Sequence, residues 1–278
     1  QFLINPEKIM RAKQIAELVN VLFPLHLQEE YDNAGSQVLF PDEEISSILI
    51  ALDIDAEIIN EAIEKQCKMI ITHHPFFFRP IKSINSADPK SSILISLINA
   101  RISLYAAHTN LDKILYNRLG EALGMPEGTV LFSTDSGVDT VPAGPGMISD
   151  LPGPVSLKDL LPRVKKALDI EFLVYSGEPD RAVSRVALLN GAGGNSIEKI
   201  IRTASPDCII TGDVGYHNVR TAIENGTAVI DAGHYGTEKI LLSCLKDSLA
   251  HKLGATEEGK NISLHITGRE RNPFQVFI

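Results

Sequence analysis

Residues 48–52 read Ile-Leu-Ile-Ala-Leu, and residues 69–71 read Met-Ile-Ile. Short apolar runs of this kind, rich in β-branched side chains, are typical of strands that are buried on both faces. Residues 56–66, which lie between the two runs, have the apolar spacing of an amphipathic helix. Because parallel strands need a connection of about a dozen residues or more, usually a helix, this order predicts parallel pairing and an α/β fold.

The same order of strand, helix and strand recurs in the second half of the chain. Its three segments are predicted at residues 186–189, 196–204 and 208–210. A further strand follows in each half, at residues 102–105 and 228–230. The repetition predicts two similar α/β lobes that are related by an internal repeat.

Each of these further strands leads into the pattern Ala-x-His-x-x-x-acid. The pattern holds His108 and Asp112 in the first half, and His234 and Glu238 in the second half. The offset between the copies is 126 residues for both members, since 234 − 108 and 238 − 112 are equal. A separation of four places the two side chains on one face if a helix begins there. The two pairs are therefore predicted to be copies of one ligand pair.

A stretch rich in proline and glycine separates the two halves. Residues 137–154 hold four prolines and several glycines, which is typical of a loop or linker. We therefore predict a first lobe at residues 1–136, a linker at residues 137–154 and a second lobe at residues 155–278. Terminal elements can exchange between the lobes in this arrangement.

Side chains that can bind metals lie at the predicted carboxyl ends of the strands. His73 and His74 follow the strand at residues 69–71, and the two His/acid pairs follow the later strands. In an α/β sheet, ligands collect at the carboxyl ends of the strands. Imidazole nitrogens and carboxylate oxygens suit a divalent ion such as zinc, manganese, iron or nickel. The predicted metal ligands are His73, His74, His108, Asp112, His234 and Glu238.

The number of donors indicates two ions rather than one. Six donors exceed what one tetrahedral site uses, but they suit two ions about 3.5–4 Å apart that share a carboxylate. The neighbours His73 and His74 normally point in different directions on a strand end, so they can serve different ions. We therefore predict two divalent ions in a cleft between the lobes, with open positions for water or substrate. The absence of thiolate ligands argues against a structural zinc site.

Other polar residues belong to the same region in this interpretation. Asp213 and His217 occupy the second half's counterpart of the His73-His74 turn, and we assign them catalytic roles in proton transfer or substrate binding. Residues 191–195, Gly-Ala-Gly-Gly-Asn, fit either a phosphate-binding turn or a tight turn that needs glycine, and the sequence leaves both open. The chain has no Gly-x-Ser-x-Gly motif, which argues against a Ser-His-Asp triad.

Composition argues against several other classes of function. The formal net charge is −9 and no dense run of Lys and Arg occurs, which argues against nucleic acid or an anionic membrane as the partner. The chain has no tryptophan and only 6% aromatic residues, which disfavours a stacking platform for single-stranded nucleic acid. Three separated cysteines without a Cys-x-x-Cys pair, and no apolar run of about 18 residues, predict a cytoplasmic protein without a membrane span.

Several motifs together resemble the NGG-one-interacting factor three family, whose members are often called GTP cyclohydrolase I type 2 homologs. The resemblance runs through residues 31–35, 71–75, 108–112, 211–214, 231–238 and 272–274. It implies a pair of similar α/β lobes, a dinuclear metal centre in the cleft between them, and assembly into a ring-shaped homohexamer. The family's ligand positions correspond to the same six residues that spacing selects.

The chain resembles the short form of this family and departs from its pattern in three places. The stretch at residues 137–183 is too short for the inserted domain of longer members. Tyr31 stands where the family usually has tryptophan, Leu39-Phe40 replaces a glycine, and the glycine-rich stretch after Asp112 is shortened at residues 113–117. The last departure can change the shape of the cleft while it leaves the ligands in place.

The leading hypothesis is a metal-dependent hydrolase that acts on a nucleotide or a phosphorylated small molecule. Two bound ions would lower the pKa of a water molecule to about 7, and Asp213 or His217 would move its proton. The resemblance implies opening of a purine ring, as in GTP cyclohydrolase chemistry, and phosphoester hydrolysis is another candidate reaction. The alternative is a metal-binding assembly or regulatory factor that catalyses nothing.

Overall fold

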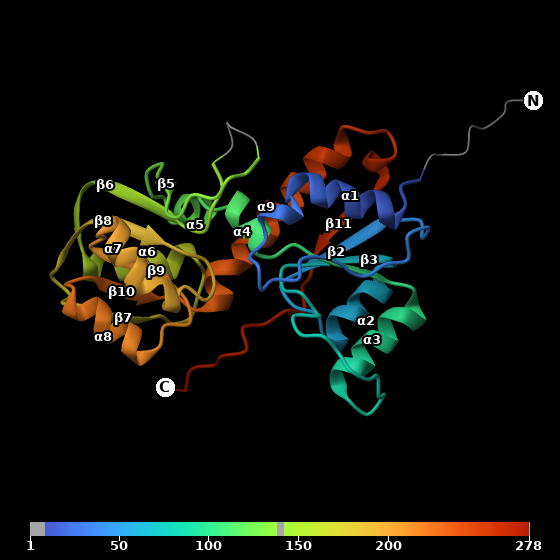
Figure 1. Cartoon of the computed structure of the whole chain (residues 1–278), viewed down its shortest axis with the longest axis horizontal. Helices are drawn as coiled ribbons and strands as arrows, with labels where there is room; N and C mark the ends of the chain where they lie inside the picture. The colour runs from blue at the N-terminus through green and yellow to red at the C-terminus, as the bar shows by residue number, and fades with distance from the viewer. Residues whose placement is uncertain (1–8, 138–141, 278) are drawn as a thin grey trace, which may run out of the picture. The chain divides into compact units, whose positions relative to one another are not determined.

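The computed structural model describes residues 9–137 and 142–277. The chain forms two compact units, each built around its own β-sheet (Figure 1). Unit one comprises Gln1–Leu111 and Leu242–Arg271, and unit two comprises Asp112–Leu241 and Asn272–Ile278. Among the described residues, none of the helices combines the length and the apolarity that crossing a bilayer requires.

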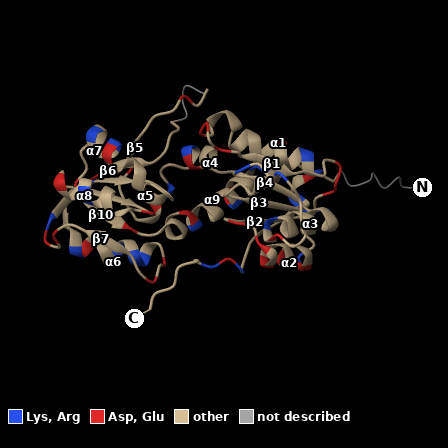
Figure 2. Cartoon of the chain, turned by 60° about the horizontal axis from the view of Figure 1, so that its bottom comes forward, with Lys and Arg blue, Asp and Glu red and all other residues tan. Residues whose placement is uncertain are grey.

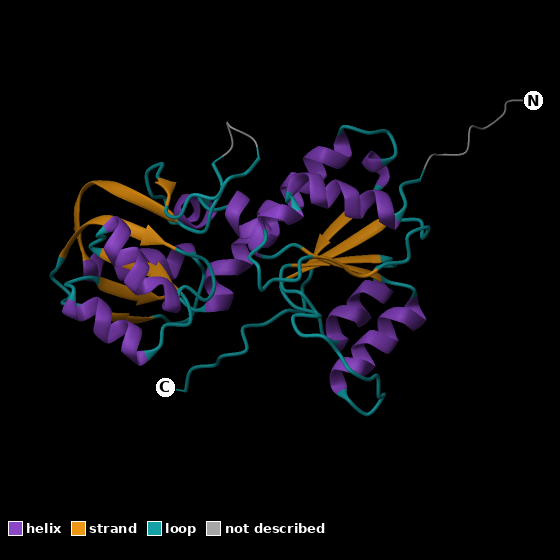
Figure 3. Cartoon of the chain, in the orientation of Figure 1, coloured by secondary structure: helices purple, strands orange, loops and turns teal. Residues whose placement is uncertain are grey.

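Unit one contains a five-stranded sheet with the order β1-β4-β3-β2-β11. Its strands are β1 (Gly35–Val38), β2 (Ser47–Ala51), β3 (Met69–Thr72), β4 (Ser103–Ala106) and β11 (Ser263–Ile266). β1 is antiparallel to β4, and the other pairs are parallel. The helices are α1 (Ala12–Leu22), α2 (Ala56–Glu64) and α3 (Pro89–Ala100). Figure 3 shows α2 and α3 on one face of the sheet and α1 on the other.

Unit two contains a six-stranded sheet with the order β5-β6-β8-β9-β10-β7. Its strands are β5 (Thr129–Val130), β6 (Met147–Ser156), β7 (Val174–Ser176), β8 (Ala182–Leu188), β9 (Cys208–Thr211) and β10 (Ala228–Asp231). β8, β9 and β10 pair in parallel, while the outer pairs are antiparallel. The helices are α5 (Arg118–Ala122), α6 (Leu157–Ala167), α7 (Ile197–Ala204) and α8 (Tyr216–Glu224).

Two further helices cross the boundaries between the units along the chain. α4 (Thr109–Ile114) contains the boundary at Leu111, and α9 (His234–Gly254) begins in unit two and ends in unit one. Short 3-10 helices occur at Leu25–Leu27, Gly194–Ser196 and Gly259–Asn261.

Apolar side chains cover both faces of the parallel strands in unit two. One buried cluster joins Val186, Cys208 and Ile230 to Leu160 and Val164 of α6. A second cluster, on the opposite face, joins Ala187, Ile209 and Val229 to helices α7 and α8. Burial on both faces is the reason that these strands read as continuous apolar runs in the sequence.

Helices α2 and α3 each begin directly after an aspartate whose side chain caps the first turn. Asp55 accepts a hydrogen bond from the backbone N–H of Ile58 at 2.8 Å, at the start of α2. Asp88 caps α3 in the same way through the N–H of Ser91, also at 2.8 Å. Each cap satisfies a backbone donor that the first turn of a helix leaves without a partner in the helix itself.

The predicted α/β class is confirmed, but the division of the chain differs from the predicted one. The second part of the predicted linker, residues 147–154, belongs to β6, which pairs antiparallel with β8. Met147 and Ser149 are buried there, and the proline-rich part lies at an irregularity of register between Asp150 and Val155. A strand tolerates proline where its ladder is interrupted, so proline and glycine content alone gave the wrong boundary. Residues 138–141 lie outside the described residues.

The end of the chain supplies elements to the first unit. Part of α9 and all of β11 belong to unit one, where β11 pairs with β2 in parallel. Residues 242–271 are thus grouped with the first part of the chain, while the exchange of terminal elements between two related lobes stays a prediction. The internal repeat itself stays a prediction, although each sheet contains three adjacent parallel strands in the same chain order.

The buried carboxylate of Glu61 in α2 forms hydrogen bonds with the C-terminal segment just after β11. Glu61 is 5% exposed, and its carboxylate accepts hydrogen bonds from Thr267 Oγ1 at 2.5 Å and from the N–H of Gly268 at 3.2 Å. Burial alone would raise the pKa of Glu61, but these hydrogen bonds and the charges of Lys65 and Arg269 outweigh it and lower the pKa below its usual 4.5.

We therefore expect a contribution of Glu61 to stability that depends on pH. Because the folded-state pKa is the lower one, the contribution is complete above about pH 4.5 and is lost as the pH falls through the folded-state pKa. Glu61→Gln should lower the free energy of unfolding in urea by about 1–2 kcal/mol at neutral pH and by less in acid. Glu17→Gln, at an exposed position of α1, is the control. An equal loss at both pH values would contradict the assignment.

Candidate metal centre

Three histidines come together at the carboxyl end of the sheet in unit one. β3 ends at Thr72 and β4 at Ala106, and these two residues are partners in the parallel register. His73 and His74 therefore lie beside His108. One ring nitrogen of each histidine lies within 4.8 Å of those of the other two. His73 is buried and the other two are half-buried, so this His73/His74/His108 group is able to hold a metal ion.

Each of these rings has a hydrogen-bond partner at its Nδ1 atom. The partners are the carbonyl oxygen of Ala107 for His73 (3.0 Å), Asp53 for His74 (3.0 Å) and Asp32 for His108 (2.7 Å). A carbonyl or carboxylate oxygen accepts, so each Nδ1 carries the proton of its hydrogen bond, and in the neutral form of the ring it is the only protonated nitrogen. The other nitrogen, Nε2, then carries the lone pair that a metal needs, and this is the usual arrangement around metal-binding histidines.

Asp32 is held firmly in this role by the residues that follow His108. Its second oxygen accepts hydrogen bonds from the N–H of Thr109 at 3.1 Å and from the Thr109 hydroxyl at 2.5 Å. Burial would raise the pKa of Asp32, but the hydrogen bonds from His108 and Thr109 and the nearby charge of His108 lower it to about 2. The side chain is therefore a carboxylate at neutral pH and fixes the orientation of the His108 ring.

A second pair of predicted ligands lies at the start of α9 in unit two. His234 and Glu238 are one helical turn apart, and His234 Nε2 lies 3.0 Å from Glu238 Oε2. Glu238 is 3% exposed. The Nδ1 atom of His234 is hydrogen-bonded to the carboxylate of Asp213 at 2.7 Å. This repeats the pairing of histidine and carboxylate seen in unit one. The spacing of four in the sequence predicted this pair correctly as neighbours on one helix face.

The predicted catalytic residues occupy different surroundings. Asp213 has a left-handed backbone (φ 54°), which few residues other than glycine adopt, and its carboxylate contacts His234. His217 is exposed on α8, where its ring lies edge-on to Tyr216 at 5.4 Å. Asp112 lies in the first turn of α4 and is half-buried. The roles assigned to Asp213, His217 and Asp112 stay predictions, while the structure adds a contact between Asp213 and a predicted ligand.

The sequence reasoning did not identify two carboxylates that orient histidines. Asp32 and Asp53 lie 76 and 21 residues away from the histidines that they contact. In the sequence, Asp32 is recognised only as part of a family motif, and Asp53 only as a polar residue that follows a predicted strand. No local spacing links either residue to its partner.

Comparison of the sequence with known proteins gives matches over most of the chain. The sequence model of Duf34/NIF3, the NGG1p interacting factor 3 family, matches residues 10–273. The chain belongs to the Duf34/NIF3 family. A Clostridium acetobutylicum relative called GTP cyclohydrolase 1 type 2 homolog is 35% identical over 251 residues, which are 88% of this chain and 92% of that protein. A Helicobacter pylori protein called GTP cyclohydrolase 1 type 2 is 32% identical over 228 residues, which are 82% of this chain and 86% of that protein.

Solved structures of Duf34/NIF3 relatives share the fold. The Bacillus cereus protein related to NIF3 has a TM-score of 0.89 and 24% sequence identity, over 98% of this chain and 100% of that chain. Reduced HcgD from Methanocaldococcus jannaschii has a TM-score of 0.76 and 29% identity, over 93% of this chain and 98% of that chain. These values support the two-sheet α/β architecture of this Duf34/NIF3 member.

The glycine-rich turn of this Duf34/NIF3 protein is explained by close packing. A Cβ atom added at Gly193 would lie 2.1 Å from Thr211 Oγ1, and one at Gly194 would lie 2.3 Å from the carbonyl oxygen of Asp213. The N–H of Gly193 is hydrogen-bonded to Thr211 Oγ1 at 3.1 Å, so it already has a partner within the protein. These contacts favour the tight turn over the phosphate-binding turn, the two alternatives that the sequence left open.

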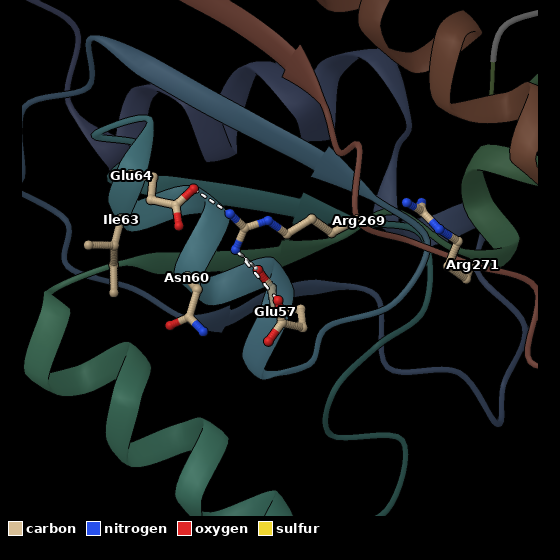
Figure 4. A pocket seen from close by; sticks show the side chains of 6 residues that line it. All are labelled: Glu57, Asn60, Ile63, Glu64, Arg269 and Arg271. Carbon is tan, nitrogen blue, oxygen red and sulfur yellow. Dashed lines mark hydrogen bonds and ion pairs between the residues drawn. The ribbon is translucent and has the colours of Figure 1, made fainter.

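A separate surface pocket in unit one does not include the predicted ligands. It has a volume of about 740 Å³ and is lined by Glu57, Asn60, Ile63, Glu64, Arg269 and Arg271 (Figure 4). Figure 2 shows acidic residues gathered on α2, which forms one side of this pocket. Arg269 is paired with both Glu64 and Glu57, so its charge is compensated within the protein. We therefore place the candidate function at the histidines rather than at this pocket.

Proposed function

We propose that this protein is a metal-dependent hydrolase that acts on a nucleotide or a phosphorylated small molecule. One observation carries the proposal: one ring nitrogen of each of three histidines lies within 4.8 Å of those of the other two, and each ring has an oxygen partner at Nδ1, as metal-binding histidines usually do. Histidines that serve only as packed or surface residues have no reason to share this arrangement. Exposed acidic groups, by contrast, are common on proteins without a bound metal ion.

The proposed ligands are the six residues that the sequence selected, His73, His74, His108, Asp112, His234 and Glu238. Neutral imidazoles together with carboxylates fit two divalent ions of the zinc, manganese, iron or nickel type. Ions held there would supply a Lewis acid that polarises a substrate oxygen and lowers the pKa of water.

The contribution of the protein itself lies in orientation and proton handling. Asp32 and Asp53 hold the rings of His108 and His74, and Asp213 holds the ring of His234. Such partners fix ring direction and raise the basicity of the ligand nitrogen. We assign proton transfer to Asp213 and His217, and His217 is exposed and therefore accessible to water.

The names of the relatives support the choice of substrate class. Several relatives are called GTP cyclohydrolase 1 type 2 or its homolog, which directs attention to hydrolytic opening of a purine ring. Phosphoester hydrolysis is the second reaction that the same proposed ligands would support. The hexameric ring and the cytoplasmic location stay predictions.

The test is a comparison of the metal-loaded and the metal-stripped protein against a panel of nucleotides and phosphoesters. We expect stoichiometric binding of a divalent ion, measured by mass spectrometry, and turnover of at least one nucleotide or phosphoester that disappears on chelation and returns with the metal. Metal binding without turnover of any compound in the panel would favour the alternative, a metal-binding assembly or regulatory factor. Failure to bind any divalent ion would overturn both.

A further inference from the structure

Two large aromatic side chains lie exposed beside the histidine group of unit one. Tyr31 is 66% exposed and Phe78 is 46% exposed. Their ring centroids are 6.3 Å apart with an angle of 61° between the planes, which is an edge-to-face contact. The Phe78 ring is also 6.4 Å from the ring of His108, at 83°. The exposed aromatic surface is therefore continuous with the edge of the candidate metal centre.

The backbone beneath these two side chains is cross-linked by hydrogen bonds. Asn33 Nδ2 donates to the carbonyl oxygen of Phe77 at 2.9 Å, and the N–H of Phe77 donates to Gln37 Oε1 at 3.0 Å. Gln37 Nε2 donates in turn to the carbonyl oxygen of Asn33 at 2.7 Å. Tyr31 is two residues from Asn33, and Phe78 follows Phe77. These three hydrogen bonds form a cycle that holds the backbone next to Tyr31 close to the backbone next to Phe78, although both rings are exposed to water.

The position of Tyr31 links this aromatic surface to the metal ligands. Tyr31 immediately precedes Asp32, the carboxylate that orients His108. A single exposed apolar side chain is ordinary on a protein surface, but a contacting pair beside a set of converging histidines marks a binding surface. Aromatic faces bind planar rings by stacking, and they tolerate different bases because every base has a π-face.

We propose that Tyr31 and Phe78 form an aromatic wall that binds a planar heteroaromatic ring, such as a purine base, beside His108. The proposal names the substrate class of the metal site and in that sense rests on the proposed function. It assigns recognition to the ring of the substrate rather than to its phosphate. Neither residue is a predicted metal ligand, so the wall can be changed while the ligands stay in place.

The experiment uses the absence of tryptophan from the natural chain. Tyr31→Trp places the only indole of the protein in the wall, and its fluorescence is titrated in the metal-loaded protein with guanosine and, separately, with ribose 5-phosphate. We expect saturable quenching by guanosine and none by ribose 5-phosphate. Adding Phe78→Leu should weaken guanosine binding by about tenfold, the size of one lost stacking contact. Tyr175→Trp, at an exposed tyrosine of β7, is the matched control.

The outcomes test base binding by the aromatic wall separately from metal binding. Equal quenching by both compounds, an unchanged affinity in the Phe78→Leu protein, or a saturable response of the Tyr175→Trp control would overturn the aromatic wall. The metal content is measured on the same samples and the titration is repeated after chelation. If guanosine binding depends on both residues but the protein holds no ion, the aromatic wall is supported and the proposed function is overturned. If the protein holds ions but its fluorescence shows no base-dependent quenching, only the aromatic wall is overturned.

Discussion

Replacing His108 and His234 together by alanine is expected to remove most of the proposed metal binding and with it the proposed hydrolytic activity. Each change deletes an imidazole whose Nδ1 is already fixed by a carboxylate, Asp32 in one case and Asp213 in the other. Loss of an orienting partner alone typically costs about 10–100-fold in metal affinity, so the loss of two ligands should exceed this range. Elemental analysis after dialysis measures the metal content, and the most active substrate of the panel measures turnover.

The matched control removes two histidines that are not predicted ligands. His26 and His251 are exposed, and the protein with both changed to alanine should keep its metal content and its activity. Circular dichroism and urea unfolding check that both double variants are folded. Retention of full metal content and activity in the His108→Ala and His234→Ala protein would eliminate these residues as ligands.

Gly191→Ala is expected to damage the predicted ligand pair of unit two without replacing either of its members. A Cβ atom at this position would lie 2.0 Å from Glu238 Oε1 and 3.3 Å from His234 Nε2, closer to the carboxylate oxygen than real Cβ atoms come. Glu238 is buried, so its carboxylate can move only by displacing its neighbours. Gly191 also has a φ of +58°, a conformation that costs a residue with a Cβ about 1–2 kcal/mol. We expect a total loss of stability of about 2–4 kcal/mol and at least about tenfold weaker metal binding.

Gly124 offers a control with the same backbone conformation and open space. Its φ is +65°, and an added Cβ atom would meet nothing within 4 Å among the described residues. Gly124→Ala should therefore cost only the conformational part, about 1–2 kcal/mol, and should leave metal binding unchanged. If the two variants lose the same stability and the same metal, the contact between residue 191 and Glu238 has no role in the site.

The proline-rich segment and the glycine-rich turn illustrate where composition is a weak guide. Residues 147–156 form β6 because their backbone pairs with β8 and side chains such as Met147 and Ser149 are buried, and composition does not report that partner strand. The glycines at 193 and 194 are required by the approach of Thr211 and Asp213, which lie about twenty residues later in the chain. In both cases the deciding contact is distant in sequence.

The parallel strands and the histidines at their ends follow from the sequence itself. Apolar runs of a few residues and the helical spacing between them are local patterns, and parallel pairing then brings the ends of β3 and β4 together. This local information is sufficient to place His73, His74 and His108 in one group, and a separation of four is sufficient to pair His234 with Glu238. The physical reason is that the periodicity of strands and helices determines which side chains share an edge or a face.

Only the tertiary structure decided which oxygen faces each histidine ring. Asp32 and Asp53 meet His108 and His74 through folding of segments that lie far apart in the chain, and the aromatic pair Tyr31 and Phe78 is assembled in the same way. Such contacts depend on how loops pack over the ends of a sheet, for which no periodic pattern exists in the sequence. The sequence by itself therefore determined the fold class and the candidate ligands. Tertiary packing determined the orientation of the candidate ligands and brought the exposed aromatic pair Tyr31 and Phe78 together.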